Sequence, residues 1–252
     1  MKRSAFGAFV GIIVAGCATT NPISTPPYYP SNPSAVLLTH EGEIQTSGIV
    51  SNGGETFLAA YALTPHIGLL ADGSLALHKA GDPNGNQYSG DLGIGYFDTS
   101  ASGHIVHELY GAVGLGTVHD YLPGYTPSFT SEQIPSIKND ENVRFGDAWL
   151  QAAGGYVGRN FSIVAVGRFS YLNLYWDRNQ ESISYQFQGL AMPFDTSFTR
   201  TSHFFIVSPG FEIRFGLEYI QLIASLFERI PFGAINYIPA TILESLGICY
   251  KF

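Results

Sequence analysis

The stretch that decides the fold runs from Thr241 to Phe252 and reads TILESLGICYKF. Leu246, Ile248, Tyr250 and Phe252 recur at every second position, and smaller or more polar residues alternate with them. Because successive side chains of a strand point to opposite faces, this period of two predicts a strand with one apolar and one more polar face. A soluble β-sandwich could hold the same strand, so the choice between a soluble and a membrane protein depends on the rest of the chain.

The composition favours a membrane β-barrel over either a soluble domain or a helical membrane protein. Only 13% of the 252 residues are charged, whereas 14% are aromatic and 29 residues are glycine. About a quarter of the residues of a typical soluble domain are charged. Yet the sequence contains no internal apolar run of the roughly 18 or more residues that a membrane-spanning helix needs. Barrel strands reconcile these facts, because only every second residue faces lipid.

Net charge and cysteine content exclude several partners and cofactors. The formal net charge is −8, whereas a nucleic-acid partner would require a basic surface. Of the two cysteines, Cys17 and Cys249, the first lies at an expected processing site, so neither a disulfide framework nor a metal cluster is expected. We therefore expect no metal, no other cofactor and no nucleic acid.

Residues 1–16 have the features of a signal peptide, and residues 17–40 have those of a tether. Lys2 and Arg3 precede an apolar run, Ala5 to Ala15, which is too short to span a bilayer as a helix. The residues after Cys17 are rich in Pro, Ser, Thr and Asn, a composition that predicts an extended linker and not a packed element. The packed domain is then expected to comprise residues 41–252.

From residue 41 onward, alternating segments repeat as they do in the C-terminal stretch. Short connections are expected near 64, 98, 158 and 216, and long ones after about 120, 176 and 229. Outer-membrane barrels have short turns on one side and longer loops on the other, and closure leaves no unpaired strand edge in hydrocarbon. We predict an all-β fold, a closed antiparallel transmembrane β-barrel of about ten strands, with eight or twelve as alternatives. The expected strands are about 41–50, 55–63, 66–78, 87–97, 103–119, 144–157, 161–175, 203–215, 217–228 and 241–252.

Two short motifs add a family resemblance. The residues from Val14 to Cys17, VAGC, resemble a lipobox, in which the cysteine is diacylated and becomes the mature N-terminus. Gly247, Tyr250 and the terminal Phe252 resemble the C-terminal signal that the barrel-assembly machinery reads in Gram-negative outer-membrane barrels. Together with the tether and the strand pattern, they make the chain similar to outer-membrane β-barrel lipoproteins. The resemblance implies a lipid-anchored integral barrel in the outer membrane, lipidation of Cys17, contact with outer-membrane lipid, and recognition by the assembly machinery.

The polar faces of the expected strands predict a charged lumen. Two arginines lie among several acids, which could form either a catalytic array or a lattice of ion pairs. Because side chains fill the interior of small barrels, and buried charges must be paired, the lattice is the default interpretation. The residues of this expected lumen charge network are Asp72, Asp91, Glu108, Asp147, Arg168, Glu212 and Arg214.

Residues near the long connections offer two further interpretations. The sequence contains no GxSxG nucleophile elbow and no phosphate-binding glycine loop. Omptin-like barrel proteases also have ten strands and use Asp and His residues at the outer rim, but no motif here fixes a spacing among His119, Asp120, Asp140, Asp177 and His203. Aromatic residues in the same regions could form a membrane-interface girdle or a partner surface. They are Tyr121, Tyr125, Phe129, Trp176, Tyr185, Phe187, Phe194 and Phe198.

We therefore expect a non-enzymatic structural or accessory subunit, which contacts other outer-membrane or surface proteins through its extracellular loops. The alternatives are an omptin-like or other rim-active hydrolase and, third, a narrow passive pore. The sequence leaves open the identity of the partner and whether the lumen is plugged.

Overall fold

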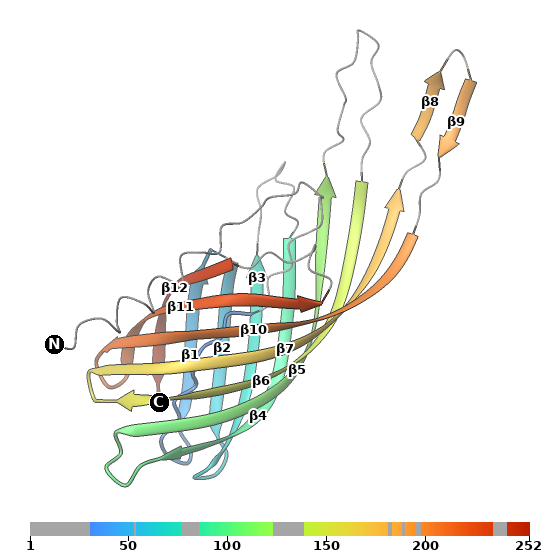
Figure 1. Cartoon of the computed structure of the whole chain (residues 1–252). Coiled ribbons are helices and arrows are strands. Elements are labelled where there is room, and N and C mark those ends of the chain that lie inside the picture. The colour runs from blue at the N-terminus through green and yellow to red at the C-terminus, as the bar shows by residue number, and fades with distance from the viewer. Residues whose placement is uncertain are drawn as a thin grey trace, which may run out of the picture.

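Ten strands form a closed antiparallel barrel in the computed structural model (Figure 1), which describes residues 31–52, 54–76, 86–122, 139–180, 183–187, 190–194, 198–233 and 241–252. No helix within these residues is long and apolar enough to cross a bilayer. Two further short strands, β8 (Ile183–Phe187) and β9 (Leu190–Phe194), pair only with each other. The barrel strands are β1 (Ile44–Ser51), β2 (Gly54–Ala62), β3 (Ile67–Ala76), β4 (Asn86–Thr99), β5 (Ile105–Leu122), β6 (Asn139–Val157), β7 (Phe161–Gln180), β10 (Phe198–Gly216), β11 (Ile220–Gly233) and β12 (Thr241–Lys251).

The C-terminal stretch closes the barrel, because β12 pairs with β1 on one side and with β11 on the other. The register with β1 runs from Gln45 opposite Lys251 to Ser51 opposite Ser245. Every barrel strand therefore has two neighbours, and the sheet order is β1-β12-β11-β10-β7-β6-β5-β4-β3-β2. The prediction of a closed antiparallel barrel is confirmed, and the barrel has ten strands.

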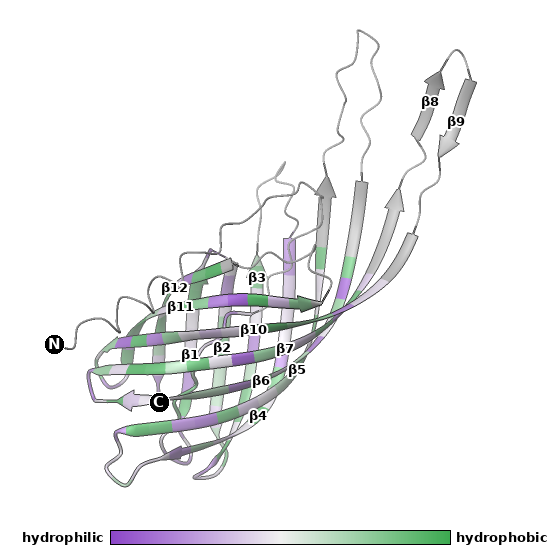
Figure 2. Ribbon diagram, in the orientation of Figure 1, coloured by the Kyte–Doolittle hydropathy of each residue, from purple (hydrophilic) through white to green (hydrophobic). Residues whose placement is uncertain are grey.

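The outer face of the barrel is apolar. Hydrophobic and hydrophilic residues alternate along the strands (Figure 2), and the large apolar side chains on the outward positions are widely exposed, as Leu92 and Leu115 are at 71% and 75%. A soluble monomer rarely exposes an apolar patch larger than a few hundred Å². Aromatic side chains also gather near one end of the strands, at Tyr61, Tyr156 and Tyr250, where transmembrane barrels carry an interfacial girdle. This exterior is that of a transmembrane β-barrel.

The two ends of the barrel differ in their connections. Residues 63–66, 100–104, 158–160 and 217–219 form short turns at the end where β1 begins and β12 ends, which we call the short-turn end. The opposite end, here called the loop end, holds the longer connections after β3, β5, β7 and β11. This distribution agrees with the predicted one.

Four strands continue beyond their predicted ends. β5, β6, β7 and β10 have 18, 19, 20 and 19 residues and extend past the shorter strands at the loop end (Figure 1). Polar residues interrupt the apolar alternation at 139–142 and 177–180, so the predicted strands stop short of the loop end: β6 begins at residue 139 and not at 144, and β7 ends at 180 and not at 175. Pairing continues nevertheless, and Asn139 lies opposite Gln180 at the far end of the β6–β7 ladder.

The lumen contains a segment of the chain itself. Residues 31–38, SNPSAVLL, are buried along their whole length inside the barrel, and we call them the lumen strap. Sequence analysis assigned residues 17–40 to an extended tether, and the structure instead packs this last part of it. The physical reason is that Ala35 to Leu38 are apolar and that charged lumen side chains bind the strap's backbone.

Candidate functional site

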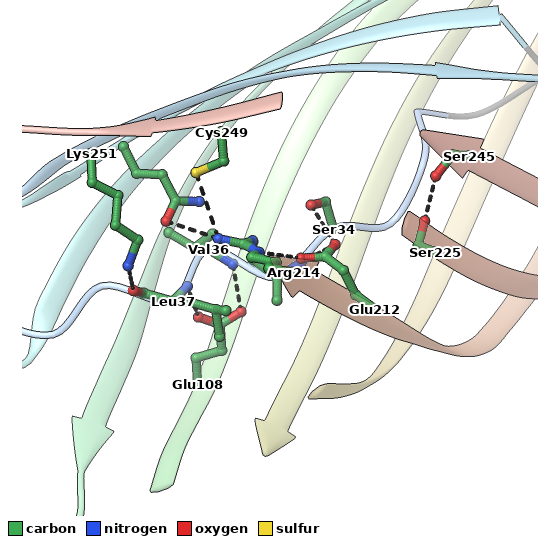
Figure 3. Close-up of polar contacts among 12 residues, drawn as sticks. Ser34, Val36, Leu37, Glu108, Glu212, Arg214, Ser225, Ser245, Cys249 and Lys251 are labelled. Carbon is green, nitrogen blue, oxygen red and sulfur yellow. Dashed lines mark hydrogen bonds and ion pairs between the residues drawn. The ribbon is translucent and has the colours of Figure 1, made fainter. Parts of the chain in front are cut away.

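Glu108 on β5 binds the backbone of the strap. Its two carboxylate oxygens accept hydrogen bonds from the N–H groups of Val36 and Leu37, each at 2.8 Å. Leu37 has a φ of 57°, in the left-handed region, which turns two successive N–H groups towards one anion. Figure 3 shows the carboxylate below these two residues of the strap. Glu108 thus fixes the strap at its apolar half.

Arg214 and Glu212, both on β10, form an ion pair with no exposed side-chain surface. Arg214 Nε lies 2.6 Å from Glu212 Oε1, and the other carboxylate oxygen of Glu212 accepts a hydrogen bond from Ser34 Oγ at 2.8 Å. The guanidinium also donates to the carbonyl oxygen of Ala35 and, at 3.2 Å, to Gln45 Oε1 (Figure 3). A buried ion pair needs such additional hydrogen bonds to offset the loss of water. The strap supplies part of them.

Arg168 on β7 holds the loop-side part of the strap. Its Nη1 donates to the carbonyl oxygen and to the hydroxyl of Ser31, at 3.1 and 2.8 Å. Its Nε donates to Gln151 Oε1 at 3.0 Å, and Gln151 in turn donates to the carbonyl oxygen of Ser34 at 2.8 Å. The guanidinium lies over the ring of Trp149, 4.1 Å from the centroid, which is a cation–π geometry. Arg168 therefore connects the strap to the barrel wall.

Three aspartates lie close together, and two of them, Asp72 and Asp91, contact Ser31. Asp72 lies opposite Asp91 in the β3–β4 ladder, and Gly114 on β5 lies opposite both Asp91 and Asp147. A Cβ atom on Gly114 would overlap carboxylate oxygens of Asp91 and Asp147, so glycine is what admits both acids. Ser31 Oγ donates to Asp91 Oδ2 at 3.2 Å. In the part of the chain that the structure describes, no three His, Cys, Asp or Glu residues are placed to hold a metal ion.

Glu43 and Lys251 close the strap at the short-turn end. Glu43 accepts hydrogen bonds from the N–H and hydroxyl of Thr39, at 2.7 and 2.8 Å, and lies 3.2 Å from Lys251 Nζ. Lys251 also donates to the carbonyl oxygen of Leu37 at 2.9 Å. Burial raises the pKa of Glu43, but the Lys251 ammonium and the hydrogen bonds from Thr39 outweigh it and leave the pKa below its ordinary value.

The structure brings the residues of the expected lumen network into one interior. Their side chains are all buried, and six of the seven, all except Asp147, have hydrogen bonds to the strap. Sequence reasoning missed the strap itself and the polar barrel residues that complete its binding. The only available signal for the strap was the apolar end of an otherwise polar tether. The seven residues are Asp72, Asp91, Glu108, Asp147, Arg168, Glu212 and Arg214, and the missed ones that contact the strap or its partners are Glu43, Gln45, Gln151 and Lys251.

The residues of the two predicted terminal motifs lie apart from this site. Gly247 lies on β12 opposite Ile49, where a Cβ atom would press on the β1 backbone. Tyr250 and Phe252 lie on the exterior at the short-turn end, 42% and 72% exposed. Cys17 lies outside the described residues.

Of the five rim residues of the hydrolase hypothesis, only His203 has a side chain within the described residues. His203 is exposed on the outer face of β10, where its Nδ1 lies 2.9 Å from the Tyr171 hydroxyl and the two rings stack. In the β10–β7 ladder it lies opposite Asn173, four residues before Asp177. The side chains of the other rim candidates and of the loop aromatic residues lie outside the described residues. They are His119, Asp120, Asp140, Asp177, Tyr121, Tyr125, Phe129, Trp176, Tyr185, Phe187, Phe194 and Phe198.

A closed barrel with an apolar exterior and a lumen filled by its own chain defines a plugged transmembrane β-barrel. No protein-family model matches the sequence, and no curated protein matches it either. Among solved structures, the chain is similar to the N-terminal β-barrel domain of Pseudomonas aeruginosa OprF. The two are 10% identical, with 84% of this chain and 98% of that one covered and a TM-score of 0.34. Identity this low carries no information on function.

Proposed function

We propose that this protein is a non-enzymatic barrel lipoprotein of the Gram-negative outer membrane. In this role it is a structural or accessory subunit that contacts other outer-membrane or surface proteins through its extracellular loops. The observation that carries the proposal is the filled lumen, which assigns the charged interior to holding the strap. The apolar exterior contacts outer-membrane lipid, and the short-turn end faces the periplasm, as in other outer-membrane barrels.

The strap argues against chemistry or transport inside the barrel. A general acid or base must come within hydrogen-bonding distance of its substrate. Glu108, Glu212 and Arg168 instead direct their polar atoms to the strap and are covered by it. A passive pore would need an open path along the axis, and the strap lies along that path. The charges therefore act as a structural lattice that includes the strap.

The long strands support a role for the loop end. A transmembrane strand needs about 9–11 residues to cross the bilayer. β6, β7 and β10 have 19, 20 and 19 residues, so a sheet stands beyond the membrane at this end. Between β7 and β10 the chain forms the β8–β9 hairpin (Figure 1). An ordered platform of this kind suits contact with another protein better than short disordered loops would.

Processing and biogenesis complete the proposal. The lipobox-like residues from Val14 to Cys17 support a diacyl anchor on Cys17. Gly247, Tyr250 and Phe252 support recognition of the last strand by the barrel-assembly machinery before β12 closes against β1.

The proposed contact is tested by deleting Tyr185–Phe198, which contains β9 and most of β8, and joining the ends with a short glycine linker. Binding energy at an interface concentrates on a few anchors, often aromatic ones, and this segment contains Tyr185, Phe187, Phe194 and Phe198. We expect partners recovered with wild-type protein in mild detergent to be lost, while the barrel still shows heat-dependent migration on a gel.

One control variant and two contrary outcomes complete this test. Replacing residues 234–240 with a glycine linker should leave partner recovery unchanged. An unchanged partner set after the Tyr185–Phe198 deletion would refute the proposed contact. Peptide cleavage by purified protein that disappears in His119→Ala or Asp120→Asn would favour the hydrolase instead, because proton transfer depends on single positioned groups.

A further inference from the structure

The lumen strap crosses the barrel lengthwise. At the short-turn end, Thr39 binds Glu43 just before β1 begins, and the carbonyl oxygen of Leu37 accepts a hydrogen bond from Lys251 at the end of β12. At the other limit, Asn32 Nδ2 donates to Ser51 Oγ at 2.8 Å, and Ser51 is the last residue of β1. The strap therefore enters the lumen at the loop end and leaves it at the short-turn end.

The direction of the strap bears on which side of the membrane the residues before it lie. β1 begins and β12 ends at the short-turn end. An ordinary linker before β1 would therefore lie on that side of the membrane. Here the chain turns back at Gly42, whose φ is 81°, and its earlier residues run up through the lumen. Ser31 lies inside the barrel beside Asp72 and Asp91, which are four residues before the loop-side end of β3 and five residues after that of β4.

We propose that the residues before Ser31 are displayed at the outer surface of the cell, and that the lipid on Cys17 inserts into the outer leaflet. This inference rests on the proposed function as an outer-membrane lipoprotein. The start of β1 at the short-turn end would by itself suggest an anchor in the inner leaflet, whereas the course of the strap assigns the anchor to the outer leaflet. The partner of the anchor is thus the outer-leaflet lipid around the loop end of the barrel.

The length of the chain agrees with this arrangement. Fourteen peptide steps separate Cys17 from Ser31. At about 3.3–3.6 Å for each extended residue, they reach at most roughly 50 Å, which is enough to pass from the loop-end mouth over the barrel rim.

The inner leaflet is closed to the same segment for two physical reasons. A path back through the lumen is occupied by the strap, which is buried along its length. A path through the bilayer would put unpaired backbone N–H and C=O groups into about 30 Å of hydrocarbon, at a cost of several kcal/mol for each group. Only the outer surface remains accessible to residue 30 and those before it.

Cysteine labelling on intact cells tests the proposal. Ser24→Cys and Thr20→Cys place a thiol before the strap, Asn52→Cys marks the loop end, and Arg159→Cys marks the short-turn end, where the native side chain is 82% exposed. The probe is a membrane-impermeant maleimide, and Cys249 is buried and provides a low background. We expect Ser24→Cys, Thr20→Cys and Asn52→Cys to react on intact cells, and Arg159→Cys to react only after the outer membrane is permeabilised.

The result distinguishes the inference from the proposed function. If Asn52→Cys reacts on intact cells but neither Ser24→Cys nor Thr20→Cys does, the surface display is refuted while the outer-membrane barrel stands. If Asn52→Cys is shielded and Arg159→Cys reacts, the proposed orientation in the membrane fails. Intact mass measurement tests the lipid separately, because wild-type protein should carry a diacyl mass that Cys17→Ala lacks.

Discussion

Arg214 and Glu212 show at the scale of single residues how the lumen can hold charges without water. Both side chains are fully enclosed, and each satisfies the other as well as the strap. Removing one partner leaves the other as an uncompensated buried charge, which costs about 3–5 kcal/mol in measured cases. We expect Arg214→Met to lower the free energy of unfolding by about this amount, measured by denaturant unfolding in detergent.

Arg159→Met is the matched control for this substitution. Arg159 also lies near a carboxylate, Glu218, at 3.7 Å, but its side chain is 82% exposed. Exposed ion pairs contribute about 0–1 kcal/mol, so this variant should unfold almost as wild type does. Equal stability of Arg214→Met and wild type would mean that the Arg214 guanidinium is solvated and that the lumen is open to water.

Glu43 gives the fold a defined response to acid. Its pKa in the folded protein lies below its ordinary value, which is about 4.3 for an unfolded chain. Its contribution to stability is therefore complete above pH of about 4.3 and is lost as the pH falls through the lower folded pKa, because the unfolded state binds the proton more readily there. We expect the stability of wild type to fall more steeply with acidification than that of Glu43→Gln. Parallel curves for the two proteins, from denaturant unfolding at a series of pH values, would contradict this assignment.

At the scale of elements, the strap depends on close contact with the inner face of β3. A Cβ atom on Gly68 would overlap the Tyr110 hydroxyl and come within 2.9 Å of Leu38 Cδ1. Overpacking of this kind typically costs about 1–3 kcal/mol, because neighbouring side chains must leave their rotamers. We expect Gly68→Ala to lower the unfolding midpoint in denaturant by a corresponding amount.

Gly167→Ala provides the comparison within the same barrel. Gly167 lies on the outer face of β7, and no atom approaches its Cβ position within 4 Å. Alanine there should leave stability unchanged or raise it slightly, since it reduces the entropy of the unfolded chain. A similar loss of stability in both variants would indicate that the sheet tolerates no added Cβ atom at either glycine, and would contradict a specific contact between β3 and the strap.

The sequence predicted the elements where local periodicity determines them. Period-two alternation identified ten strands and the seven charged residues that the structure buries in the lumen. It began β6 too late and ended β7 too early, because the ladder from Asn142 to Asn139 is held by pairing with β7 and not by an apolar face. The strap was missed because its receptors are remote in sequence, Ser34 and Glu212 being 178 residues apart. No local pattern reports a contact of that range.

At the scale of the whole molecule, the same strand pairing that closes the barrel also encloses the strap. The strap directly precedes β1, and β1 pairs with the last strand, β12. The chain therefore closes around its own N-terminal segment when the two ends of the sheet meet. This topology accounts for the buried charged side chains of the interior and for the course of the strap along the lumen.

Burial of the strap is tested most directly by the reactivity of Ser34→Cys, since Ser34 has no exposed surface inside the barrel. The variant is made in a Cys17→Ala background, where the buried Cys249 is the remaining native thiol. Ser102→Cys, on an exposed short turn, provides the reactive reference. In folded protein, a water-soluble maleimide should label Ser102→Cys but leave Ser34→Cys as unreactive as its parent, and denaturant should make all of them reactive. Labelling of folded Ser34→Cys as fast as Ser102→Cys would contradict a barrel plugged by its own strap.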